Sequence, residues 1–446
     1  MSAISRRVLP GWRSRTTFVM ALAVSAVGLG NLWRFSWLAG KHGGGAFVVS
    51  YVLCLMLIVV PLMVAEVALG MHGRGSPVTA LRRTAVHSGL SHHWQWLGVL
   101  AVVTGLLVSA YYSVIAGWAL AYAEAMQAGV FSSASAMTVA EHLTSFLQDA
   151  DAMAYWLTVF LAPVLLISAG GVRRGLGLLV WLLVPGIIVL LYVLVDYALR
   201  VGELDLAQDF LFSVKWVDFT WQTFFLALQQ AFFTLAIGVG VGIMFGAYAP
   251  QRVPIFRSVM AVALFDTLVA LAAGVAVFPV IFAHNMQPYL GPGLLFISVP
   301  YGYGNMAQGE LFGALYFALV ALVALGSTVA LLEPAVAWVI ERSGWPRVFA
   351  VVLVGALVWA LGLLVVGSIS MIDAQSTPHL LQQLDAMSTG VLIPLVVLLT
   401  AVFVGWRIGG DILRIELYRE SATFFPLWRL FLRYIAPLLI VVLVLV

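Results

Sequence analysis

Long apolar segments alternate with short polar ones along almost the whole chain. Because about 20 apolar residues are needed to cross a bilayer, this pattern predicts eleven membrane-spanning helices. Their expected bounds are 16–39, 46–70, 95–127, 154–170, 176–199, 221–249, 257–283, 309–340, 347–369, 386–406 and 427–446. We therefore expect an all-α polytopic membrane protein in which residues 1–446 form one transmembrane domain.

The first apolar segment is interrupted in its middle, where Gly28, Gly30 and Asn31 fall at membrane depth. Glycine weakens a helix by roughly 1 kcal/mol relative to alanine. Arg34, one turn later, is costly in a bilayer unless it faces a cavity or a partner. Irregular backbone at this depth persists only where protein buries it or where it lines a cavity. The segment is therefore expected to be a broken helix that lines a binding site.

The sixth apolar segment carries a matching glycine cluster at Gly238, Gly240 and Gly242. Glycines in membrane helices can also serve simply to let neighbouring helices pack closely. A matched pair of glycine-interrupted segments, however, is typical of a transporter whose site lies between two inverted repeats. With Asn31 and Thr234 beside the two breaks, we favour the binding site.

Composition excludes several classes of protein. The chain is 63% hydrophobic and only 9% charged, whereas a soluble domain carries about 25% charged residues, so no separate soluble domain is expected. The net charge of +3 comes from basic residues scattered over short loops, which does not indicate a nucleic-acid partner. The sequence shows no histidine cluster, phosphate-binding loop or nucleophile–base pattern. We therefore expect neither an enzyme nor an organic cofactor.

The basic residues predict the orientation, because cytoplasmic loops carry an excess of lysine and arginine. With the N-terminus in the cytoplasm, four of the 22 basic residues lie outside: Arg34, Lys41, Arg200 and Lys215. Eleven spans then place the C-terminus outside. The two long connections, 129–152 and 283–308, become external, and the second holds enough aromatic and apolar residues to fold over the outer mouth as a lid.

Several motifs resemble the neurotransmitter:sodium symporter family, most closely its bacterial amino-acid transporters. They are SAVGLGNLWRF (Ser25–Phe35), GGGAF (Gly43–Phe47), PLMVAEVALG (Pro61–Gly70), YYSVIAGW (Tyr111–Trp118), QAFFTL (Gln230–Leu235) and ALGSTVALLE (Ala324–Glu333). The resemblance implies sodium-coupled symport in a bacterial inner membrane and a LeuT-like fold of eleven helices with broken helices 1 and 6. The implied parts are 16–199 and 221–406 as inverted five-span repeats, and 427–446 as span eleven.

The resemblance also implies one or two bound sodium ions, a hard cation that prefers oxygen ligands. The first site would use Ala26, Asn31, Thr234 and Asp266. Bacterial relatives carry a fixed carboxylate where animal members bind chloride. Asp266, with Tyr51 and Gln230 beside it, would fill that role and make transport chloride-independent. The alternative for Asp266 is a structural hydrogen bond inside the bundle.

The second sodium site would use the carbonyls of Val24, Val27 and Val323 with the Ser327 hydroxyl. Here the sequence departs from the family, because Gly326 stands where an oxygen-bearing side chain is usual. One ligand is missing, so the site is either weaker or completed by water or by Thr328. The number of sodium ions therefore stays open.

By the same resemblance, Gly28 leaves room for a substrate that brings its own carboxylate, where amine transporters carry an acid. The backbone of Leu29 and Gly30 and the Tyr112 hydroxyl would hold this carboxylate, and carbonyls of Ala26, Phe233 and Thr234 the ammonium. The pocket for the substrate side chain would consist of Val108, Tyr112, Phe233, Ala236, Val239, Ser327 and Leu331. These residues are uncharged, and Ala236 and Val239 replace larger family residues. A large aliphatic or aromatic side chain is therefore expected, although ordinary helix packing also explains such positions.

Gates are expected on both sides of this site. Outside, Arg34 would pair with Asp385 across the mouth, with Tyr112 and Phe233 closing beneath them. Inside, Trp12 fits the family pattern, but Leu9 stands where the family has an arginine. Arg6, Arg7 or Arg13 could substitute, with Glu341 and Tyr248 as partners. Glu66 is expected to cap the backbone freed in span six, whereas the sequence assigns Glu333 no role.

We therefore expect a sodium-coupled symporter of a neutral, apolar amino acid that works by alternating access. Its partners would be this small molecule and the lipid bilayer, with the chain a monomer or a weak homo-oligomer. Two alternatives remain open at this point: a sodium-coupled carrier of another zwitterion, such as a betaine or an omega-amino acid, and a non-transporting amino-acid sensor.

Overall fold

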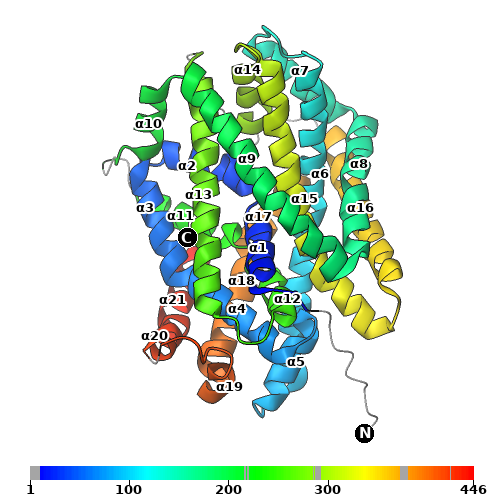
Figure 1. Cartoon of the computed structure of the whole chain (residues 1–446), viewed down its shortest axis with the longest axis vertical. Coiled ribbons are helices and arrows are strands. Elements are labelled where there is room, and N and C mark those ends of the chain that lie inside the picture. Colours follow the sequence, from blue (N-terminus) through cyan, green and yellow to red (C-terminus); the bar gives the residue numbers. More distant parts are fainter. Residues whose placement is uncertain are drawn as a thin grey trace.

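The computed structural model describes residues 11–214, 217, 220–284, 286, 293–371, 380–421 and 423–445. Within these residues the fold is helical, with one isolated bridge between Gly44 and Val214 in place of any sheet. Most helices run along the long axis of the molecule (Figure 1). The described N-terminal segment lies at the same end as the short helices α5 (Pro77–His87), α19 (Gly410–Arg414) and α20 (Phe424–Leu430).

Nine continuous helices of the described chain are long and apolar enough to cross a membrane. They are Gly45–Gly73 (α3, η2, α4), His92–Gln127 (η3, α6), Ala150–Ala169 (α8), Val172–Val201 (η4, α9), Ile255–Phe282 (α13), Gly309–Ser343 (α15), Arg347–Ser370 (within α16, Arg347–Met371), Leu380–Arg407 (α17, η7, α18, η8) and Phe424–Leu443 (α20, η9 and most of α21). Each corresponds to one of the segments expected from hydropathy.

The two remaining spans are broken, as the glycine clusters predict. Span one consists of α1 (Arg15–Ala26) and the helix Gly30–Lys41 (η1 and α2), which meet at an angle of 60°. Span six consists of α11 (Trp221–Thr234) and α12 (Val241–Tyr248). Neither half of span six is long enough to cross a bilayer alone, since about 20 residues are required. With these two broken spans, the described structure agrees with the expected eleven.

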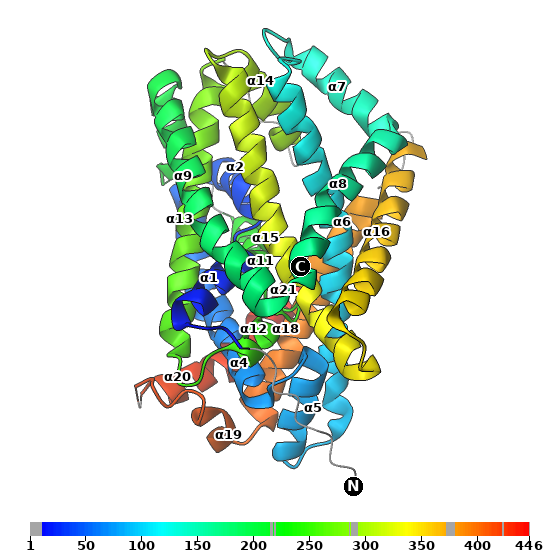
Figure 2. The same cartoon turned by 45° about the vertical axis from the view of Figure 1, so that its right-hand side comes forward.

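The helices differ in how deeply they are buried. In their most apolar windows, α15 and α6 are 78% and 72% buried, whereas α8 and the helix containing α9 are each 33% buried. A helix that is apolar all round and mostly exposed faces lipid in a membrane protein. Figure 2 shows α6 and α15 in the middle of the bundle, with α8, α9 and α16 around them. Helices α6 and α15 therefore form the buried centre of the bundle.

Short helices form the two long connections expected on the outer side. The first contains α7 (Ala136–Gln148), and the second contains η6 (Leu294–Ser298) and α14 (Val299–Gly304). Figure 1 places α7 and α14 at the end opposite the described N-terminal segment. The second connection is packed onto the bundle, because the Tyr303 hydroxyl donates to the Ala276 carbonyl at 2.9 Å and Phe296 packs against Trp118. Part of the predicted lid, residues 285 and 287–292, lies outside the described chain.

Candidate functional site

The break in span one leaves backbone groups that local side chains satisfy. Helix α1 ends at Ala26, and Val27 is extended. The Gly28 N–H donates to the Asn31 carboxamide oxygen at 2.9 Å. The Leu29 N–H donates to the Tyr112 hydroxyl at 2.8 Å. Both N–H groups precede the half-helix that begins after the break, and the N-terminus of a helix favours a negatively charged group.

The break in span six depends on backbone conformations that favour glycine. Gly238 and Gly240 have φ angles of +77° and +78°, a region that residues with a Cβ rarely adopt. The Gly238 N–H donates to the buried Glu66 carboxylate at 2.8 Å. Glu66 thus contacts the backbone freed by the break, as the sequence predicts.

Asp266 lies at the centre of a buried polar cluster between the two breaks. One of its carboxylate oxygens accepts from the Asn31 carboxamide at 2.9 Å. The other accepts from the hydroxyls of Thr234 at 2.7 Å and Tyr51 at 3.2 Å. All four side chains are buried. The cluster supplies one negative charge and several oxygen atoms, the donor set that a hard cation prefers.

Gln230 was expected in the same corner, but its side chain turns toward the helix break. Its amide nitrogen donates to the Gly30 carbonyl at 3.4 Å, and no described contact joins it to Asp266. The structure thus brings Asn31, Thr234 and Asp266 together, and Tyr51 donates a hydrogen bond to Asp266. Ala26, the fourth expected ligand, is the last residue of α1 beside them.

The expected second sodium site brings three carbonyls around one hydroxyl. The Ser327 hydroxyl lies 2.7 Å from the Val27 carbonyl, 3.1 Å from that of Val323 and 3.4 Å from that of Val24. The Thr328 hydroxyl donates instead to the Ala324 carbonyl of its own helix at 2.8 Å. Completion of the site by Thr328 stays a prediction, because a hydroxyl that donates within its own helix keeps lone pairs that can bind a cation.

Helices α1 and α15 approach each other so closely at Gly326 that a side chain there would meet its neighbours. A Cβ at this position would lie 2.2 Å from the Val24 side chain and 2.9 Å from that of Leu183. A hydroxyl-bearing residue does not fit unless Val24 is smaller or moves. The missing ligand thus has a steric cause that the sequence pattern did not reveal.

A small cavity of about 40 Å³ lies between the breaks and α6. Its lining includes every pocket residue expected from the sequence: Val108, Tyr112, Phe233, Ala236, Val239, Ser327 and Leu331. The rest of the lining consists of Ser25, Ala26, Gly28, Phe232, Ile237 and Ile393. Of these, Ile237 and Ile393 are apolar residues outside the sequence motifs, which nothing in the sequence separates from ordinary core. The described lining carries no ionisable charge. A Cβ added at Gly28 would lie 2.9 Å from the Tyr112 hydroxyl.

A larger vestibule of about 490 Å³ lies above this cavity, and Tyr112 and Phe233 line both. Arg34 and Asp385 line the vestibule but do not form the predicted ion pair in the described structure. Arg34 donates to the Gln229 side chain at 3.1 Å, and Asp385 accepts from the Tyr111 hydroxyl at 3.2 Å. Each group has a neutral hydrogen-bond partner in place of the other.

The opposite end is closed by aromatic packing. Trp12 is buried and packs edge-on against Phe245 and Tyr248, with ring centroids 5.4 and 6.1 Å apart. The backbone N–H of Trp12 donates to the Tyr248 carbonyl at 2.8 Å. Trp12 and Tyr248 thus pack together, and their role as an inner gate stays a prediction. Arg6, Arg7 and Leu9 lie outside the described residues, and Arg13 makes no ion pair within them.

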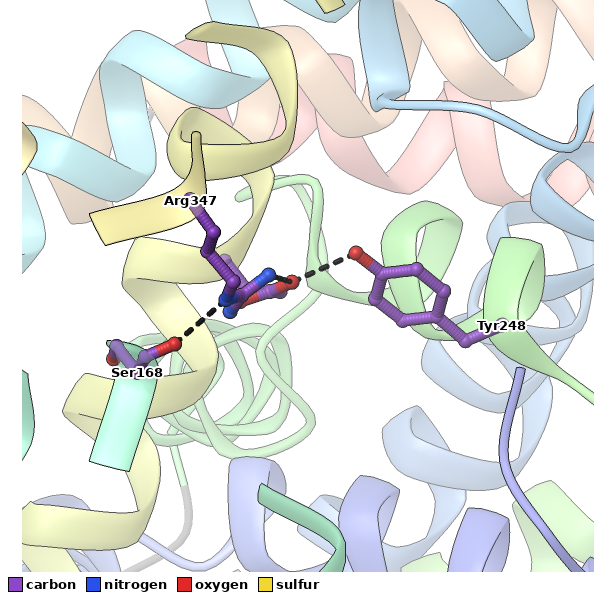
Figure 3. A network of polar contacts seen from close by, with 4 residues as sticks. Ser168, Tyr248 and Arg347 are labelled. Carbon is purple, nitrogen blue, oxygen red and sulfur yellow. Dashed lines mark hydrogen bonds and ion pairs between the residues drawn. The ribbon is translucent and has the colours of Figure 1, made fainter. Parts of the chain in front are cut away.

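Tyr248 and Glu341, the expected partners of an inner-gate arginine, take part in two different sets of contacts. The Tyr248 hydroxyl donates to Glu333 at 2.7 Å, and Glu333 forms a two-point ion pair with Arg347. Figure 3 shows Arg347 between Tyr248 and Ser168, whose carbonyl accepts from it at 2.7 Å. This network joins α12, α15, α16 and α8.

Glu341 lies beyond this network, toward the end of α15. It accepts a hydrogen bond from the Ser76 N–H at 2.8 Å and further ones from the Ser76 and Thr79 hydroxyls. These donors belong to the N-terminus of α5, so Glu341 anchors α5 to α15.

Comparison with known proteins agrees with this geometry. Residues 10–135 and 131–446 match the model of the sodium:neurotransmitter symporter family. The uncharacterized sodium-dependent transporter YhdH of Bacillus subtilis is 31% identical over 97% of this chain and 96% of its own length. An uncharacterized sodium-dependent transporter of Methanocaldococcus jannaschii is 27% identical over 94% of this chain and 86% of its own length.

A solved structure extends the likeness to the fold. The crystal structure of MhsT in complex with L-phenylalanine superposes with a TM-score of 0.87 and 31% identity, over 98% of this chain and 99% of MhsT. The two broken spans, the polar cluster between them and these matches lead to the same result. The chain belongs to the sodium:neurotransmitter symporter family, whose members are membrane transporters and not enzymes.

Proposed function

We propose that this protein is a symporter that couples sodium to a neutral amino acid with a large aliphatic or aromatic side chain. The observation that carries the proposal is the buried Asp266 cluster between the two helix breaks. A buried carboxylate bound only by neutral donors is costly, and a sodium ion between Asp266, Asn31 and Thr234 would compensate its charge. Because the carboxylate belongs to the chain, transport needs no chloride.

The substrate end of the site supports an amino acid. Glycine at position 28 lets the Tyr112 hydroxyl come close to the break, where it accepts from the Leu29 N–H. A substrate carboxylate can accept hydrogen bonds there and share the first sodium ion, which makes the binding of ion and substrate cooperative. MhsT, which is similar over nearly its whole length, is solved with L-phenylalanine. The described cavity of about 40 Å³ must widen to admit such a side chain.

The second sodium ion binds more weakly in this proposal. The Ser327 hydroxyl is the one side-chain ligand assigned to it, since Gly326 contributes none. A site made of three carbonyls and one hydroxyl carries no formal charge to attract a cation. Coupling therefore depends chiefly on the first ion.

The difference between the two ends of the bundle supports transport by alternating access. The vestibule side is open, whereas Trp12 and the Glu333–Arg347 pair close the other side. We assign the closed end, which carries most of the basic residues, to the cytoplasm. Closure of the vestibule would bring Arg34 and Asp385 together as the outer gate.

A thermal-stability screen of purified protein tests the assignment of ligands. We expect large neutral amino acids, leucine and phenylalanine among them, to raise the unfolding temperature in sodium but not in potassium. Replacing chloride by gluconate should leave that shift unchanged. Stabilisation by betaine or an omega-amino acid alone would favour the other zwitterion carriers, and no sodium-dependent ligand among the twenty amino acids would refute the proposal.

A further inference from the structure

A second pocket lies at the closed end of the molecule, far from the helix breaks. It has a volume of about 370 Å³ and is formed by α5, the beginning of α6 and the end of α15. Figure 2 shows α5 at the same end of the bundle as the first turns of α6. Arg82 from α5 and Arg342 from α15 line the pocket from two separate elements. The transport mechanism gives neither arginine a role.

Both arginines are available to bind an anion. Within the described part of the chain, neither guanidinium has a hydrogen bond or an ion pair with a carboxylate. Glu341 also lines the pocket, but the Ser76 N–H and the hydroxyls of Ser76 and Thr79 engage its two oxygens. These three donors partly offset the negative charge of Glu341. The pocket also holds two positive charges, on Arg82 and Arg342, against this single negative one. The pocket carries a net positive charge that no described side chain neutralises.

The aromatic residues of the pocket place it at the level of the membrane interface. Trp96 lies in the first turn of the spanning helix α6 and is 63% exposed, and Trp338 lies in the last turns of the spanning helix α15. Tryptophan is enriched where the headgroups of a bilayer begin. Val99 adds an apolar wall one turn further into the bilayer. From the end of the molecule inward, the pocket thus offers arginines, then indole rings and then an apolar wall. A phospholipid presents its charged headgroup and its acyl chain in the same order.

We infer that this pocket binds the headgroup of an anionic phospholipid. The phosphate would accept hydrogen bonds from Arg82 and Arg342, and Gln95 at the mouth would meet the polar part of the headgroup. Basic pockets between membrane helices on the cytoplasmic side bind phospholipid headgroups in this way. A lipid bound there would link α5 to the scaffold helix α15, beside the anchor that Glu341 already provides. The inference is independent of the amino acid that the protein carries.

Native mass spectrometry of delipidated protein titrated with phosphatidylglycerol or phosphatidylcholine tests this inference. We expect the wild type to bind phosphatidylglycerol preferentially. Each basic residue beside an anionic lipid contributes about 1 kcal/mol, so R82Q or R342Q should weaken binding about fivefold and the double variant about 25-fold. Arg174, exposed at the same end but outside the pocket, supplies the matched control R174Q, which should bind like the wild type.

Three outcomes overturn the inference. They are equal binding of the two lipids, unchanged binding by R82Q/R342Q, and an equal loss in R174Q. A further titration with soluble glycerol phosphate distinguishes a lipid headgroup from a free phosphate compound as the ligand. Saturation by glycerol phosphate at micromolar concentration would assign the pocket to a free anion, whereas binding of the lipid alone supports the headgroup. If the double variant does not fold, the single variant R342Q, on the exposed last turn of α15, decides the question by its fivefold effect.

Discussion

Single glycines determine what the two binding regions can hold. At Gly28 the Tyr112 hydroxyl lies 2.9 Å from the place of a Cβ, and at Gly326 the Val24 side chain lies 2.2 Å from it. The first glycine lets the Tyr112 hydroxyl reach the Leu29 N–H, and the second removes a side-chain ligand from the expected second sodium site. The same residue type thus favours a substrate carboxylate in one place and weakens ion binding in another.

The close contact between Gly28 and Tyr112 can be tested by substitution. In G28A the new methyl group would lie 2.9 Å from the Tyr112 hydroxyl, and overpacking of this kind typically costs about 1–3 kcal/mol. We expect roughly tenfold weaker apparent affinity for the amino acid, measured as the concentration for half-maximal uptake. In the control G186A the methyl group meets no atom within 4 Å, so its uptake should match the wild type. Unchanged affinity in G28A would mean that the substrate lies elsewhere.

The charge of Asp266 should be required for sodium binding. In D266N the side chain keeps its shape but loses the charge that attracts the ion, while Asn31, Thr234 and Tyr51 remain. We expect at least tenfold weaker sodium activation of uptake, because a partly buried charge pair is worth a few kcal/mol. The conservative variant Y51F removes one donor and should have a smaller effect. Equal sodium activation in D266N and the wild type would leave Asp266 with a structural role.

At the scale of elements, the close approach of α1 and α15 decides the chemistry of the second ion site. G326S should destabilise the protein by about 1–3 kcal/mol, as overpacking does, because its Cβ would overlap the Val24 side chain. V24A/G326S should recover the loss and add a hydroxyl beside Ser327. We expect thermal unfolding to show the recovery, and sodium activation to become steeper in the double variant. Full stability of G326S alone would contradict the steric account.

The network of Glu333, Arg347 and Tyr248 joins four helices at the closed end. Removing one partner of a buried ion pair typically costs about 3–5 kcal/mol, because it leaves an uncompensated charge. R347M should therefore be much less stable than E333Q/R347M, in which both charges are absent. A double-mutant cycle on unfolding temperature measures this coupling, with R174M as the exposed control. Additive effects would show that the pair contributes nothing specific.

The whole molecule shows an open vestibule at one end and packed aromatic rings at the other. If the vestibule closes around substrate, Leu381 in its wall should become protected. Cys54, the single cysteine, is buried, so L381C can be labelled with a polar maleimide against a low background. We expect sodium plus amino acid to slow labelling several-fold, and either alone to do less. A labelling rate that never changes would contradict closure on this side.

The sequence predicted the spans, both breaks and the pocket because each has a local signal: a run of apolar residues, a glycine cluster or a motif. Pairings between distant elements had no such signal. Glu333 and Glu341 lie on the same helix, and their sequence positions do not tell which one meets Tyr248 and which one caps α5. The Arg34–Asp385 pair failed for a different reason, since it depends on whether the vestibule is open.

Uptake into proteoliposomes tests the central claim most directly. Radiolabelled leucine or phenylalanine is followed in vesicles with an inward sodium gradient, an inward potassium gradient or no gradient, each with gluconate in place of chloride. The account predicts accumulation above the external concentration in the sodium gradient alone, and its loss in D266N. Equal uptake in sodium and potassium, or no accumulation of any large neutral amino acid, would contradict sodium-coupled symport.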